Sequence, residues 1–207
     1  MWPGGDKLAS EGPAAFYSAD YFADYPPGYI LVLGLVSLVR KALQLSYESR
    51  WTYFLLALIP AICDCAAVVL LDHISRRYMG QGRAQRCLVL FAAFCPLTLF
   101  DTGIWKQIDG AFALPLLLCF WLLEERRYLL AAVLYGVALA IKPQALLAGP
   151  VLAVCFLVAI ADAVRDGKSP LKSVGQIFGG AALALLPPLL AGLPFLRGKK
   201  SGAVLDR

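Results

Sequence analysis

Apolar residues form long runs separated by short polar patches along most of this 207-residue chain. The runs do not alternate with polar residues as the strands of a membrane barrel would. A bilayer interior admits only backbone that is hydrogen-bonded within itself, so the pattern predicts an all-α, polytopic transmembrane helical bundle. The runs cover residues 28–39, 51–71, 88–100, 110–123, 128–141, 145–161 and 174–196.

The runs differ in length, which predicts an irregular bundle. A full membrane span takes about 20 residues, so only 51–71 and 174–196 are comfortably long. The shorter runs must tilt, use flanking polar residues or stop part-way. Pro187-Pro188 and Pro194 predict a kink or break in the last run. We therefore expect short and proline-broken helices around a cavity.

The polar segments divide the chain into three predicted parts. Residues 1–27 form an external polar segment, 28–196 a multi-span transmembrane domain, and 197–207 a basic tail. Within the membrane domain, residues 162–173 carry several charges, a glycine and a proline. This segment is expected to be a solvated connector.

Composition supports a membrane protein and excludes a nucleic-acid partner. Hydrophobic residues make up 60% of the chain and charged residues 16%, against about a quarter charged in soluble domains. The net charge of +5 comes from basic residues dispersed at segment ends, which favours topology signals and contacts with membrane lipids. All six cysteines lie in or beside apolar runs, as small buried hydrophobes rather than metal ligands.

The basic residues of segment 72–87 constrain the topology. If every run crosses the membrane, this segment lies outside, against the positive-inside bias. If one of the first two runs does not cross, the segment lies inside and the polar patches share the outer face. We favour the second topology, although it leaves the basic tail outside. The residues concerned are Arg76, Arg77, Arg83 and Arg86.

The first polar patch covers residues 24–29 and contains Pro26-Pro27. Two prolines are incompatible with a helix interior and suit a helix start. One interpretation is a rigid entry turn with Tyr25 as an interfacial anchor. In the other, the Asp24 carboxylate faces a cavity. Taken alone, the patch favours the structural interpretation.

The second patch precedes the run 110–123 and contains Trp105, Gln107 and Asp109. If this loop is extended, the alternate spacing turns the three side chains to one side. A carboxylate and an amide there could bind sugar hydroxyls while Trp105 stacks on a ring. The equally favoured alternative is an aromatic-belt tryptophan and a helix cap by Asp109.

The third patch, Lys142-Pro143-Gln144, interrupts an apolar stretch. Pro143 disfavours helix at Lys142 and forces a break. Lys142 could extend towards the interface or hold a phosphate as a point charge, and its place in a break favours the second role. Asp64, inside the run 51–71, is a functional candidate as an intramembrane carboxylate, with pairing to an arginine as the alternative.

The order of these motifs resembles bacterial membrane glycosyltransferases of the GT-C superfamily, and above all mannosyltransferase-like proteins related to GPI mannosyltransferases. The resemblance covers about residues 11–155. It rests on Gly12-Pro13, Phe16-Tyr17-Ser18, Asp24-Tyr25-Pro26-Pro27-Gly28-Tyr29, Asp64, Trp105-x-Gln107-Ile108-Asp109 and Lys142-Pro143-Gln144-Ala145-Leu146.

The resemblance implies a multi-pass protein of the bacterial plasma membrane. It would transfer a sugar, with mannose as the expected one, from a polyprenyl-phosphate-linked donor to an acceptor on the outer face. Asp109 matches the aspartate of the family's Trp-Gly-Gln-x-Asp motif, and Lys142 matches its Lys-Pro-Gln motif. The predicted catalytic residues are Asp24 and Asp109, and the predicted substrate-binding residues are Tyr25, Trp105, Gln107, Lys142 and Gln144.

Two departures from the family pattern affect these expectations. Lys106 stands where the family usually has glycine. The family's first helix and the acidic residues after it have no counterpart before Trp2, so we expect a fragment shortened at both ends. A divalent cation and a membrane protein partner are left open, and no metal ligands are assigned. The competing hypotheses are a transporter or flippase and a non-catalytic assembly subunit.

Overall fold

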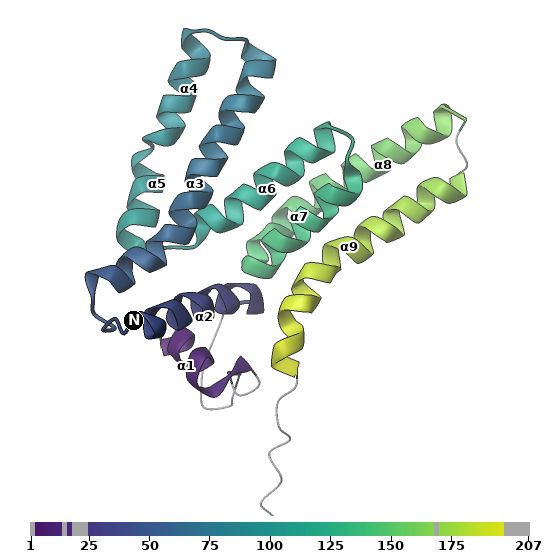
Figure 1. The fold of residues 1–207 in the computed structure, drawn as a ribbon. Coiled ribbons are helices and arrows are strands. Elements are labelled where there is room, and N and C mark those ends of the chain that lie inside the picture. Colours follow the sequence, from purple (N-terminus) through teal and green to yellow (C-terminus); the bar gives the residue numbers. More distant parts are fainter. Residues whose placement is uncertain (1–2, 14–15, 18–24, 168–169, 197–207) are drawn as a thin grey trace, which may run out of the picture.

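The computed structural model describes residues 3–13, 16–17, 25–167 and 170–196 of the chain. Described residues form helices and turns, with no strand among them, which confirms the predicted all-α fold (Figure 1). Five of the seven predicted apolar runs each lie within one helix, whereas 88–100 and 145–161 are each divided between two helical segments. The helical elements are α1 (Pro3–Glu11), α2 (Pro27–Ala42), α3 (Arg50–Met79), α4 (Arg83–Ala93), α5 (Pro96–Phe100), the π-helix η2 (Asp101–Trp105), α6 (Asp109–Glu124), α7 (Tyr128–Ile141), the 3₁₀-helix η3 (Pro143–Ala148), α8 (Gly149–Arg165) and α9 (Pro170–Leu196).

Within the described part of the chain, four helical stretches are long and apolar enough to cross a membrane. They are Arg50–Met79, Arg83–Trp105, Pro143–Arg165 and Phe178–Leu196. The expectation of only two comfortable spans was wrong, because polar and proline-bearing flanks continue the helices beyond the apolar runs. The connector predicted at 162–173 is also shorter, since α8 continues to Arg165 and α9 begins at Pro170.

Prolines act in two ways in this bundle. Pro96 and Pro143 each begin a new helical segment. Pro60, Pro115 and the three prolines of α9 lie inside helices that continue through them. The last helix is therefore continuous and bends along its length, which is the kink rather than the break of the two predicted outcomes (Figure 1). Because proline has no backbone N–H, each of these prolines removes one helical hydrogen bond, and the helix bends there instead of ending.

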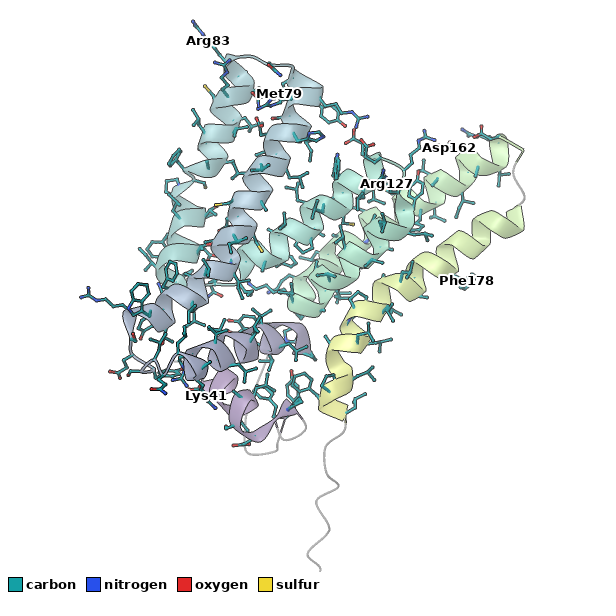
Figure 2. The ribbon with its side chains drawn as sticks, in the orientation of Figure 1. Lys41, Met79, Arg83, Arg127, Asp162 and Phe178 are labelled. Carbon is teal, nitrogen blue, oxygen red and sulfur yellow. The ribbon has the colours of Figure 1, made fainter. Side chains whose placement is uncertain are left out.

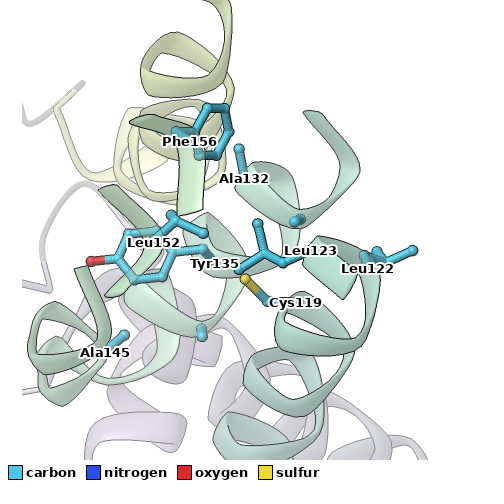
Figure 3. Packing of buried hydrophobic residues seen from close by; sticks show 10 residues of the cluster. Cys119, Leu122, Leu123, Ala132, Tyr135, Ala145, Leu152 and Phe156 are labelled. Atoms are coloured by element: carbon cyan, nitrogen blue, oxygen red, sulfur yellow. The ribbon is translucent and has the colours of Figure 1, made fainter. Parts of the chain in front are cut away.

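The larger apolar core joins α6, α7, α8 and α9 (Figure 3). Ala131 and Ala138 of α7 are fully buried, and Tyr135 and Phe156 are nearly so. At Gly136, an added Cβ would lie only 2.9 Å from Cδ of Pro187. Small residues thus let α7 and α9 approach closely, which is how helices associate where no water drives them together.

A second core packs α1 and α2 on the beginning of α6. Its buried members include Phe16, Tyr29, Ile30 and Ile108.

The ends of the helices fall into two groups. In Figure 1, α2 lies across the end of the bundle from which α6 begins, whereas the α3–α4 and α6–α7 turns lie at the far end.

An ion pair between Arg77 and Glu125 ties those two turns together. The arrangement fits the topology in which the run 28–39 does not cross the membrane. That topology stays a prediction.

Candidate active site

An ion pair between Asp109 and Lys142 joins the second and third polar patches. Asp109 is the first residue of α6, and Lys142 directly follows α7. Lys142 has an extended backbone, with φ −140° and ψ 129°, because the following Pro143 disfavours the helical conformation. Chain segments 33 residues apart therefore place a carboxylate and an ammonium at one point.

The two partners differ in their access to the surroundings. The Lys142 side chain is 18% exposed, whereas the Asp109 side chain is 46% exposed. Asp109 forms no side-chain cap, since the capping position of α6 is held by Ile108. Its negative charge still lies at the positive end of the helix dipole. The result is a fixed, open carboxylate backed by a half-buried cation.

The first patch borders this pair. An added Cβ on Gly28 would lie 2.8 Å from the carbonyl carbon of Ala140, so the beginning of α2 packs directly on the end of α7. Tyr29 is only 2% exposed and interacts electrostatically with Asp109. The Tyr25 ring stacks at a tilt on Tyr29, with 4.6 Å between centroids. Tyr25 therefore contacts the ion-pair region indirectly, through the ring of Tyr29 on α2.

Asp64, on α3, lies close to the beginning of α6. Its Oδ2 accepts a hydrogen bond of 2.5 Å from Thr102 Oγ1 in η2. No ion pair joins Asp64 to an arginine among the described residues, so threonine takes the place of the arginine considered above. Asp64 and Asp101 both lie close enough to Asp109 for their charges to interact. Three carboxylates are thus gathered near the beginning of α6, and one of them, Asp109, is paired with Lys142.

Gly110 allows this gathering of charges. An added Cβ at this position would lie 2.6 Å from the backbone carbonyl oxygen of Pro60 and would also clash with the Asp64 carboxylate. Such contacts are closer than real Cβ atoms make. The absence of a side chain at Gly110 therefore lets α6 begin against α3, which holds Asp64 near Asp109.

The loop that carries the second patch is not extended, so the condition for Trp105, Gln107 and Asp109 to share one side is not met. Residues 101–105 form a π-helix, Lys106 has a left-handed backbone, and Asp109 opens α6. Trp105 is 65% exposed and packs edge-on against Phe100. Its position favours the aromatic-belt interpretation over a ring-stacking role beside Asp109.

Gln107 and Gln144 are less closely associated with the pair. Gln107 is partly buried and its backbone N–H donates to the Asp101 carbonyl oxygen over 3.2 Å. Gln144 is exposed in η3. Neither amide side chain hydrogen-bonds Asp109 or Lys142 among the described contacts. Asp24, the other predicted catalytic residue, lies outside the described residues.

Lys106 explains why a glycine would suit this position. Its φ of 56° and ψ of 40° lie in the left-handed region, which disfavours residues with a Cβ and favours glycine. Its ammonium donates to the Gly103 carbonyl oxygen over 2.6 Å and lies 5.9 Å from the centre of the Tyr53 ring. These two contacts partly compensate for the backbone strain.

Sequence reasoning missed Asp101 and Thr102. Both follow the apolar run 88–100 directly, so they read as an ordinary run end. The sequence did offer one signal for a functional role, because a carboxylate and a hydroxyl lie between the end of this run and the second polar patch. Their closeness to Asp64 depends on the return of α4, α5 and η2 along α3, which no local pattern shows.

The described residues hold no group of three or more His, Cys, Asp or Glu side chains placed to bind a metal ion. We therefore assign no ligands to a divalent cation. What the site presents is an open carboxylate that can accept a proton and an ammonium that can stabilise negative charge. This combination suits the transfer of a group from a phosphate to a hydroxyl.

Comparison with known families agrees with this chemistry. The family model described as glycosyltransferase family 87 matches residues 22–194, which include α2 to α8, all but the end of α9 and every described residue of the site. No curated protein and no solved structure is significantly similar to the chain. The match covers most of the chain and accompanies helices that can span a membrane several times. The chain therefore belongs to glycosyltransferase family 87 and is a multi-pass membrane glycosyltransferase.

Proposed function

We propose that the protein transfers a sugar, with mannose as the first candidate, from a polyprenyl-phosphate donor to an acceptor hydroxyl. The reaction takes place at the outer face of the bacterial plasma membrane, by the GT-C type of chemistry. One observation carries the proposal, namely the ion pair of Asp109 and Lys142 at one end of a membrane bundle. Membership of a glycosyltransferase family supports the class of reaction.

Asp109 is the proposed general base. The acceptor oxygen forms a bond to the anomeric carbon of the sugar while the bond from that carbon to the donor phosphate oxygen breaks. The acceptor proton passes to the Asp109 carboxylate. This role suits a carboxylate that is half exposed, since a base must reach the proton that it removes.

Lys142 is the proposed counter-ion of the departing phosphate. An ammonium has three N–H donors and no acceptor, and the contact with Asp109 occupies one of them. The remaining donors can take the lipid-linked phosphate as negative charge develops on it. Partial burial strengthens this interaction relative to bulk water.

The remaining predicted residues receive supporting roles in this proposal. Tyr25 lies beside Tyr29 at the edge of the site and is suited to contact the sugar or the acceptor. Asp24 precedes it in the chain and is a second candidate base. Trp105 and Gln144, both exposed, would contact the lipid-linked substrate at the periphery of the site, with Gln107 behind them.

The donor class is tested with the full chain reconstituted in vesicles. Labelled mannose is supplied either on polyprenyl phosphate or on a nucleoside diphosphate, together with a membrane extract as acceptor. The proposal predicts labelled product from the polyprenyl-phosphate donor alone. Product from the nucleotide donor alone would refute the donor assignment. Transbilayer movement of the lipid-linked sugar without a new glycosidic bond would instead favour a flippase.

A further inference from the structure

The far end of the α3–α4 hairpin contains a second polar pocket. Its volume is about 310 Å³, and it lies where α3 ends near Met79 and α4 begins at Arg83 (Figure 2). From Asp64 to Arg76 the helix rises roughly 18 Å, so this pocket is separate from the candidate active site. Its lining residues are Asp72, Arg76, Gln81, Gln85, Arg86, Val89 and Leu90.

A buried hydrogen-bond network shapes the wall of the pocket. Gln85 and Ser75 are each only 4% exposed. Gln85 Nε2 donates to Asp72 Oδ1 over 2.7 Å and to Ser75 Oγ over 3.2 Å. These bonds fix the amide of Gln85, and its Oε1 has no hydrogen-bond partner among the described residues. Gln85 Oε1 can therefore accept a hydrogen bond from a bound molecule.

The charges of the pocket do not balance. Asp72 is occupied by Arg76, through contacts of 2.6 Å and 3.1 Å, and by Gln85. Arg86 and the neighbouring Arg83 form no ion pair with any described residue. The lining thus holds two guanidinium groups against one carboxylate.

The beginning of α4 adds to this positive field. Its capping residue, Gly82, supplies no side-chain hydrogen bond, and its first turn carries no acidic residue. The early backbone N–H groups of a helix lack internal partners and form the positive end of its dipole. Two arginines, Arg83 and Arg86, on this first turn of an 11-residue helix add to the same positive field, which an anion bound near them would offset.

The pocket is also amphipathic along the direction of α4. Val89 and Leu90 lie about one helical turn beyond Arg86, and Leu90 is 57% exposed. An anion bound at the arginines would therefore have apolar surface directly below it, towards the middle of the span Arg83–Trp105. A free phosphate would leave that surface unused, whereas a lipid would cover it.

We propose that this pocket binds an anionic glycerophospholipid. The phosphodiester contacts Arg76, Arg86 and the first turn of α4, a hydroxyl of the headgroup donates to Gln85 Oε1, and an acyl chain covers Val89 and Leu90. Under the favoured topology this end faces the cytoplasm, where anionic lipids attract basic groups near the surface. The proposal is independent of the sugar-transfer chemistry at the opposite end.

Native mass spectrometry of the detergent-solubilised full chain tests this site with phosphatidylglycerol and phosphatidylcholine as probes. Wild-type protein should retain phosphatidylglycerol in preference to phosphatidylcholine. Loss of both guanidinium groups in Arg76→Gln/Arg86→Gln should weaken phosphatidylglycerol retention roughly tenfold or more. Arg86→Gln alone should weaken it partly, and that change removes no ion pair of the described structure.

The matched control is Arg126→Gln/Arg127→Gln, which removes the same charge from exposed residues near the same end of the bundle. It should retain phosphatidylglycerol as the wild type does. Unchanged retention in both Arg86 variants, or an equal loss in the control, would overturn the proposal. Displacement of the lipid by an equimolar amount of inorganic phosphate would identify a simple anion site and overturn the lipid assignment.

Discussion

Thr102 Oγ1 donates a hydrogen bond of 2.5 Å to Asp64 Oδ2, and this bond ties η2 to the middle of α3. The carboxylate is partly buried and has no arginine partner among the described residues. Thr102 itself is 7% exposed, so water has little access to replace it. This contact gives Asp64 a hydrogen-bond donor in place of a counter-ion.

Removing the hydroxyl should therefore destabilise the protein. Thr102→Val keeps the shape of the side chain but leaves the carboxylate without its donor, at a cost of about 1–3 kcal/mol. Thr102→Ser keeps the hydroxyl and should lose much less. Thermal unfolding of both variants in the same detergent measures the difference. Equal stability of the valine and serine variants would show that the bond contributes nothing.

Gly110 should tolerate no side chain. Gly110→Ala places a Cβ against the Pro60 carbonyl oxygen and the Asp64 carboxylate, and overpacking of this kind costs about 1–3 kcal/mol. Gly103→Ala is the matched control, because nothing lies within 4 Å of its added Cβ. We expect a lower yield of folded protein and a lower melting temperature for Gly110→Ala alone. Similar behaviour of the two variants would contradict the close approach of α3 and α6.

The left-handed backbone of Lys106 predicts the relative stabilities of the wild type and of two variants at this position. Lys106→Gly relieves a strain of about 1 kcal/mol, whereas Lys106→Ala keeps the strain and loses the hydrogen bond to Gly103. The glycine variant should therefore be at least as stable as the wild type, and the alanine variant less stable than both. Thermal unfolding measures the order. An alanine variant more stable than the glycine variant would rule out the strain.

The placement of the helix ends predicts which residues share a side of the membrane. In a cysteine-free background, Tyr25→Cys and Gln144→Cys should react with an impermeant thiol reagent from outside intact cells. Gln81→Cys and Arg126→Cys should react only after permeabilisation. All four native side chains are exposed, so access depends on the bilayer alone. Labelling of Tyr25→Cys and Gln144→Cys from opposite sides would refute the proposed topology.

The helices could be predicted from the sequence because long apolar runs leave the backbone few alternatives in a membrane. Their ends could not. The third helix continues to Met79, past the apolar run, since Arg76 pairs with Asp72 and Arg77 with Glu125 at that end. The Arg77 pairing depends on two helices that meet only in the folded chain, whereas the Arg76 pairing lies within α3 itself.

The candidate site was predictable in part, for a similar reason. Asp109 and Lys142 stand out because charges between long apolar runs are rare, and Lys142 also lies beside the break at Pro143. The position of Trp105 could not be predicted, because it follows from a π-helix and the left-handed Lys106. Neither feature has a periodicity that the sequence displays, so the sequence could not show whether this loop is extended.

Sugar transfer by site variants tests the central claim most directly. With polyprenyl-phosphate-linked mannose as donor, Asp109→Asn and Lys142→Gln should each lower the transfer rate by about 100-fold or more. Asp166→Asn and Lys41→Gln make the same chemical changes at exposed positions outside the site and should retain nearly full activity. Folded Asp109→Asn and Lys142→Gln proteins that transfer the sugar at the wild-type rate would contradict the account.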